Sequence, residues 1–125
     1  MKPFVHLHVH SQYSILDGQA SISSLVEKAS ADGMKALALT DHGTMFGIKE
    51  FWNTCKSGNY GNSDFSKDQW YKVKPILGCE TYVAERGIEN KTGKEDRSGD
   101  HLILLAKNEI GYKNLLHLIS IANTE

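Results

Sequence analysis

Short apolar runs alternate with stretches of helical periodicity along the whole chain, and this alternation limits the available folds more than any other feature. Strand-like runs lie at 4–10, 35–40, 75–83 and 101–106, and helix-like stretches at 22–29, 46–55 and 108–122. The order strand, helix, strand, helix, strand, strand, helix predicts an α/β architecture with a mostly parallel sheet. Because four strands are too few to close a barrel, we expect part of a larger α/β barrel.

The predicted helices carry recognisable end signals. The first has two candidate N-caps, Ser21 and Ser24, and the second of these has capping-box spacing to Glu27. Gly33 is placed to end that helix in a left-handed conformation, and Asn108 offers an N-cap for the last helix. Residues 57–72 and 85–100, rich in small, polar and charged side chains, are predicted to be loops.

Composition excludes several classes of protein. The 125 residues, 40% hydrophobic, suit one domain at most. Lys and Arg number 14 against 15 Asp and Glu, which argues against binding nucleic acid by bulk charge. Two cysteines, Cys55 and Cys79, make no disulfide framework. With no secretory signal and no apolar run near the roughly 20 residues of a membrane span, we expect a cytoplasmic protein that does not contact a membrane.

Histidine is unusually concentrated at the start of the chain, where three of the six lie within the first ten residues. On a strand, His6, His8 and His10 would share one face while Leu7 and Val9 are buried on the other. Residues two apart lie about 6.6 Å apart along a strand, so two imidazoles can converge on one metal ion or on neighbouring ions. The alternative is a polar strand face with solvated histidines.

Four more residues of the types that bind metal ions lie in the first loop or close to the ends of the other predicted strands: Asp17, His42, Glu80 and His101. Loops that follow the strands of parallel α/β folds form their active face, so these side chains are expected to meet the first histidines in one multinuclear site. Glu80 can bridge two cations, and paired cations promote phosphoryl hydrolysis. Histidine and carboxylate ligands without cysteine suit Zn, Mn or Fe.

Several other side chains have two interpretations. Asp41 either accepts a hydrogen bond from a ligand histidine or caps the following helix. Tyr13 is expected to pack in its loop rather than to touch a phosphate. Cys79 should face away from Glu80 into the core, and His117 should lie on the surface. No nucleic-acid surface is assigned to the aromatic residues Trp52, Tyr60, Trp70 and Tyr71.

Five segments carry a family resemblance: 4–18, 38–43, 74–80, 101–108 and 111–115. In this order they resemble the PHP (polymerase and histidinol phosphatase) family of metal-dependent phosphoesterases. The likeness is greatest to the version at the N-terminus of bacterial replicative polymerase α subunits. It covers nearly the whole chain apart from 57–72 and 86–99.

The resemblance implies a distorted seven-stranded (β/α) barrel of TIM-like form holding up to three metal ions, of which residues 1–125 are the N-terminal portion. It implies that the metal ligands, and hence the catalytic residues, are His8, His10, Asp17, His42, the bridging Glu80, and His101. His6 matches a position that is not usually a ligand. Later strands would supply the remaining ligands, so we expect incomplete metal occupancy here and open strand edges that favour self-association.

The resemblance also implies a parent protein that extends DNA on a template with Mg. Its partners would be DNA, a proofreading exonuclease and a sliding clamp. This domain would contribute 3′–5′ exonuclease or phosphatase-type activity, and the fragment alone would be inactive. Two alternatives are a catalytically idle scaffold that docks the proofreading subunit and a free-standing phosphatase such as histidinol-phosphate phosphatase. The runs at 11–18 and 111–116 favour the polymerase branch.

Overall fold

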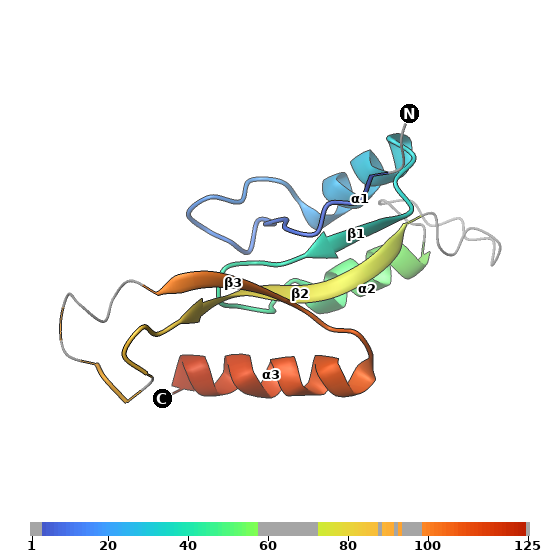
Figure 1. The fold of residues 1–125 in the computed structure, drawn as a ribbon. Coiled ribbons are helices and arrows are strands. Elements are labelled where there is room, and N and C mark those ends of the chain that lie inside the picture. Colours follow the sequence, from blue (N-terminus) through green and yellow to red (C-terminus); the bar gives the residue numbers. More distant parts are fainter. Residues whose placement is uncertain (1–3, 58–72, 88, 92, 94–98, 125) are drawn as a thin grey trace.

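The structure is a computed structural model that describes residues 4–57, 73–87, 89–91, 93 and 99–124. The described elements follow in the order α1 (Ile22–Ala31), β1 (Ala36–Leu39), α2 (Ile48–Ser57), β2 (Lys74–Val83), β3 (Asp100–Leu105) and α3 (Glu109–Thr124) (Figure 1). The α/β class is therefore confirmed. Most of the loop predicted at 57–72, and part of the one at 85–100, lie outside the described residues.

The sheet has the strand order β1-β2-β3 and is mixed rather than mostly parallel. Strand β1 pairs with β2 in parallel, whereas β2 and β3 are antiparallel, with Val83 opposite Asp100. A parallel return requires a crossover, usually a helix, and the described residues between β2 and β3 contain no α-helix. As a consequence, the beginning of β3 lies beside the end of β2 (Figure 1).

The N-terminal segment 4–10 runs beside β1 but is not a regular strand, so that prediction is wrong. Its carbonyls at His6 and Val9 accept hydrogen bonds from Ala38 N and Thr40 N, each at 2.9 Å. The three residue steps from His6 to Val9 thus lie opposite the two steps from Ala38 to Thr40, as in a β-bulge. The Val9 N–H donates its hydrogen bond to the Thr40 hydroxyl. Strict alternation is lost, and Leu7 is 48% exposed rather than buried.

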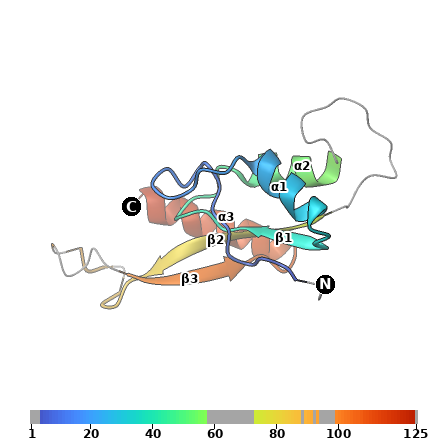
Figure 2. The ribbon, with the colours of Figure 1, turned by 90° about the horizontal axis from the view of Figure 1, so that it is seen from above.

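Helices α1 and α2 pack against each other and cover one face of the sheet (Figure 2). Ser21 caps α1, because its Oγ accepts a hydrogen bond from Ser24 N at 3.2 Å. Gly33 adopts the predicted positive φ of 72°. The core between these helices and β1 is formed by Ile22, Val26, Ala29, Leu37, Leu39, Ile48, Phe51, Cys55 and Val73.

Helix α3 packs against β2 and begins at the predicted cap, where Asn108 Oδ1 accepts a hydrogen bond from Gly111 N at 2.9 Å. Of its described residues only Leu115 is fully buried. None of the described helices combines the length and the apolar character needed to cross a bilayer.

Candidate metal centre

Glu80 is the centre of a polar cluster at the end of the sheet where β2 approaches the start of β3. Its side chain is only 2% exposed. The backbone fixes it beside His42, because Glu80 N donates to Asp41 O at 3.0 Å and Gly43 N donates to Glu80 O at 2.8 Å. These bonds extend the β1–β2 pairing past the end of β1, so the chain after β1 is held against Glu80.

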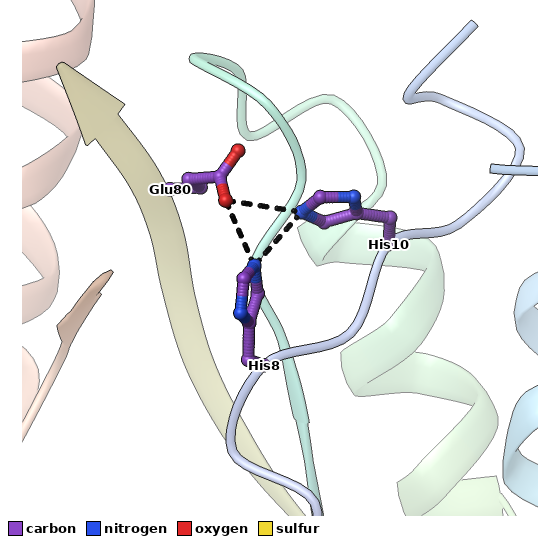
Figure 3. A group of neighbouring side chains, drawn as sticks. All are labelled: His8, His10 and Glu80. Carbon is purple, nitrogen blue, oxygen red and sulfur yellow. Dashed lines mark hydrogen bonds and ion pairs between the residues drawn. The ribbon is translucent and has the colours of Figure 1, made fainter. Parts of the chain in front are cut away.

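The first group of ligand atoms joins the N-terminal segment to β2. His8 Nε2 lies 2.8 Å from Glu80 Oε1 and 3.2 Å from His10 Nε2, and His10 Nε2 lies 3.6 Å from the same oxygen (Figure 3). Ligand atoms about 2.0–2.1 Å from a tetrahedral Zn²⁺ would stand about 3.3 Å from one another. The three observed separations scatter around that value, so this donor set fits a metal ion.

The second oxygen of Glu80 supports the same conclusion. Oε2 is buried and accepts no hydrogen bond of acceptable geometry from the described residues, although it forms a close ion-pair contact with His42 Nδ1. A buried carboxylate oxygen is normally satisfied by donors or by a cation. A carboxylate with one oxygen on the first histidine pair and the other against His42 is suited to join two cations.

The second group consists of His10, Asp17 and His42. Asp17 Oδ2 lies 2.6 Å from His42 Nε2 and 3.2 Å from His10 Nδ1. Because a neutral imidazole offers one lone pair, His10 can ligate through Nε2 while its Nδ1–H donates to Asp17. The hydrogen bond from His42, together with the charges of both histidines, lowers the pKa of Asp17 below its usual value.

Asp41 holds the loop that carries Asp17, a role that the sequence did not reveal. The Asp41 carboxylate is buried and accepts hydrogen bonds from Ser11 N at 2.6 Å, Ser11 Oγ at 2.9 Å and Ser14 Oγ at 2.8 Å. His42 N in turn donates to Ser14 Oγ at 3.1 Å. Both predicted roles of Asp41 are wrong, because its hydrogen bonds go to serines and α2 begins only at Ile48.

The same loop is closed tightly on itself. Ser14 N donates to Ser11 O at 2.9 Å, and Gly18 N donates to Ser14 O at 2.7 Å. A Cβ atom on Gly18 would lie 1.9 Å from the Ser11 carbonyl oxygen, so only glycine fits at this close approach. The loop is therefore a fixed support for Asp17.

Tyr82 is a further residue of this cluster that the sequence analysis missed. It stands two residues after Glu80 on β2, and its hydroxyl lies 2.7 Å from His42 Nδ1. Its ring meets His101 edge to face, with centroids 4.9 Å apart. Partial burial and the charges of Glu80 and Asp17 raise the pKa of Tyr82. The period of two along β2 was the available signal, because it places residues 80 and 82 on one face.

The other sequence-predicted residues take varied positions. His101 lies outside both groups, with Nδ1 3.5 Å from Glu80 Oε1. His6 is exposed and contacts Phe4. Cys79 lies in the core as predicted, and its burial raises the thiol pKa to about 11. His117 is exposed, as predicted. Tyr13 packs against the core, in accord with the predicted packing role, and its hydroxyl donates to Glu50 of α2 at 2.8 Å.

Comparisons with known proteins identify the family to which the chain belongs. The family model described as PHP domain matches residues 6–125. The chain is 46% identical to DNA polymerase III subunit alpha of Chlamydia trachomatis over 123 residues, 98% of this chain and 9% of that protein. It is equally similar to the subunits of the same name from Borreliella burgdorferi (46% over 125 residues, 98% of this chain and 10% of that protein) and Treponema pallidum (46% over 123, 98% and 9%). The chain thus spans about a tenth of the length of these curated relatives. The match along nearly its whole length shows that the chain belongs to the PHP domain family.

Proposed function

We propose that this chain is the N-terminal portion of the metal-dependent phosphoesterase domain of a bacterial DNA polymerase III alpha subunit. One observation carries the metal-dependent part: histidine nitrogens from three separate stretches of sequence meet around the buried carboxylate of Glu80, which stands on a fourth. The polymerase context rests on the similarity to alpha subunits. In that context DNA, a proofreading exonuclease and a sliding clamp would be the partners, and Mg would serve the polymerase reaction elsewhere in the protein.

The residues present divide naturally between ions. His8, His10 and Glu80 would hold one divalent cation, and Asp17 and His42 would contribute to a second. His101, close to Glu80 Oε1, would contribute to a third. Bound Zn, Mn or Fe would lower the pKa of water and neutralise charge on a phosphodiester. In the complete (β/α) barrel, later strands would add the missing ligands.

The chain's own side chains suit a phosphodiester substrate. Glu80 is buried and keeps its negative charge away from solvent, whereas the side chains of His8 and His101 are 53% and 54% exposed. The open side of the cluster therefore exposes imidazoles, which can donate to phosphate oxygens, together with the Asp17 carboxylate, 46% exposed, whose charge a bound cation would neutralise. This arrangement is consistent with a 3′–5′ exonuclease or phosphatase-type reaction.

Two alternatives to a metal-dependent phosphoesterase of the polymerase predict different experimental results. A catalytically idle scaffold would bind metal only to stabilise the fold and a partner surface. A free-standing phosphatase such as histidinol-phosphate phosphatase is disfavoured, because the relatives described above are all polymerase subunits.

The test compares His10→Ala with His6→Ala. His10 belongs to both groups of ligand atoms, whereas His6 is exposed and lies outside them, which makes it a matched control. We expect the His10 variant to lose bound metal, measured by elemental analysis, and the His6 variant to retain it. Unchanged metal content in both variants would contradict the proposed function.

Catalysis is tested in the full alpha subunit with a labelled single-stranded oligonucleotide, after inactivation of any copurifying proofreading subunit. A metal-dependent release of nucleotides that His10→Ala abolishes supports the phosphoesterase. Equal residual release in wild type and variant would leave only the scaffold.

A further inference from the structure

The hydroxyl of Tyr82 makes a contact with His42 that has the character of a hydrogen bond to the edge of the imidazole. The two ring planes are within 4° of parallel, yet their centroids are 6.2 Å apart. The short contact between the two side chains runs through the hydroxyl, whose oxygen lies 2.7 Å from Nδ1.

The opposite edge of the same imidazole faces Asp17. His42 Nε2 lies 2.6 Å from Asp17 Oδ2, so the ring is held between a carboxylate at one nitrogen and a phenol at the other. A histidine that ligates a metal through one nitrogen usually donates the proton on the other to a fixed acceptor. That donation selects the tautomer and prevents the ring from turning.

Nδ1 has a second neighbour, Glu80 Oε2, with which it forms a close ion-pair contact. This oxygen meets no hydrogen-bond geometry among the described residues. The Tyr82 hydroxyl, by contrast, lies in hydrogen-bond geometry 2.7 Å from Nδ1. When Glu80 binds cations, the Tyr82 oxygen is therefore the acceptor of the hydrogen bond from Nδ1–H.

The surroundings hold Tyr82 in place for this role. Its backbone pairs with His101 across the β2–β3 ladder, and its ring is edge to face with the His101 ring. A Cβ on Gly43, whose φ is +57°, would lie 3.4 Å from Tyr82 Cε2, so the neighbouring backbone follows the tyrosine ring closely.

From these contacts we propose that Tyr82 is a positioning residue: its hydroxyl oxygen accepts a hydrogen bond from His42 Nδ1–H and thereby directs Nε2 to the metal ion shared with Asp17. The proposal rests on the proposed metal-binding function and adds to it a residue outside the ligand set. It concerns the second group of ligand atoms, because His42 belongs to that group and not to the group of His8, His10 and Glu80 drawn in Figure 3.

The test is Tyr82→Phe, which removes the hydroxyl and keeps the ring against His101. Tyr112→Phe is the matched control, since Tyr112 lines a cavity of about 700 Å³ beside Lys74 and Pro75 at the opposite end of β2. Both variants of the full chain are titrated with Co²⁺ while its visible absorption is recorded. We expect Tyr82→Phe to weaken one class of bound Co²⁺ by about 10–100-fold and to change its spectrum. The other class, and the Tyr112 variant, should match wild type.

Three results would overturn the proposal. The first is a Tyr82→Phe protein whose Co²⁺ affinities and spectrum equal those of wild type. The second is an equal loss in every class of ion, and the third is a metal-free protein that no longer unfolds cooperatively, because either of these would indicate a general structural role. His42→Ala separates this failure from that of the proposed function: if His42→Ala loses an ion while Tyr82→Phe does not, only the role of Tyr82 is wrong. If His42→Ala binds Co²⁺ like wild type, the metal-site assignment itself fails.

Discussion

Replacing Asp41 with alanine should destabilise the protein far more than replacing any exposed aspartate. Asp41 is 2% exposed, and its two carboxylate oxygens accept three hydrogen bonds from the loop after the first histidines. Removal of the carboxylate leaves the Ser11 N–H and the hydroxyls of Ser11 and Ser14 facing a small gap. Because these donors lie away from solvent, water can compensate only in part.

The size of the effect follows from those bonds. Each buried donor left without an acceptor costs about 1–3 kcal/mol, and the loss is reduced because Asp41 no longer has to be desolvated on folding. We therefore expect Asp41→Ala to lower the free energy of unfolding by about 3–5 kcal/mol, a large share of the 5–15 kcal/mol typical of a domain. Ser14→Ala, which removes one of the three bonds to Asp41 and also the acceptor of the hydrogen bond from His42 N, should lower it by about 1–2 kcal/mol.

The assay is urea unfolding of the metal-free chain followed by circular dichroism. Asp32→Ala is the matched control, since Asp32 forms one exposed ion pair with Lys28 at 2.6 Å. Surface pairs of this kind contribute about 0.2–1 kcal/mol. If Asp41→Ala and Asp32→Ala shift the unfolding midpoint equally, the buried network does not stabilise the loop and the reasoning is wrong.

Two further predictions concern the same loop. The hydrogen bond to Glu50 raises the pKa of Tyr13 above its ordinary value of 10.0, so this contact stabilises the fold below pH 10 and is lost as the pH rises past the folded-state pKa. In a tyrosine absorbance titration, Tyr13→Phe should remove an ionisation step that lies above pH 10. If the step that disappears lies at the ordinary tyrosine pKa, the assignment is wrong. Gly18→Ala should lower the free energy of unfolding by about 3 kcal/mol, because its Cβ would meet the Ser11 carbonyl oxygen at 1.9 Å. Gly87→Ala, which meets no atom within 4 Å although its φ is +85°, should cost about 1 kcal/mol in the same unfolding measurement, and an equal loss in both would refute the steric argument.

The elements could be predicted where local sequence decides them. The buried run of β1, the positive φ at Gly33 and the Asn108 cap each depend on a few adjacent residues. The direction of β3 could not be read in this way, because an apolar run does not specify which neighbour it pairs with or in which sense. The irregular path of residues 4–10 was hidden for the same reason: the alternation is present in the sequence, and Thr40 disrupts it from 31 residues away.

The candidate site shows the same division. Ligand-type residues could be named from their chemistry and from their positions beside predicted strands. The supports could not, since Asp41 and its partner Ser11 are 30 residues apart and serine gives no signal of its own. Tyr82 was missed because a half-exposed tyrosine on a strand is unremarkable until His42 is placed beside it.

The unequal pairing of the N-terminal segment with β1 has a consequence for anyone who wishes to stabilise this protein. Restoring a full ladder there would add backbone hydrogen bonds and cover the open edge of β1. It would also change the backbone path that now brings the Nε2 atoms of His8 and His10 to 3.2 Å from each other. A redesign toward a more regular sheet should therefore trade metal affinity for thermal tolerance.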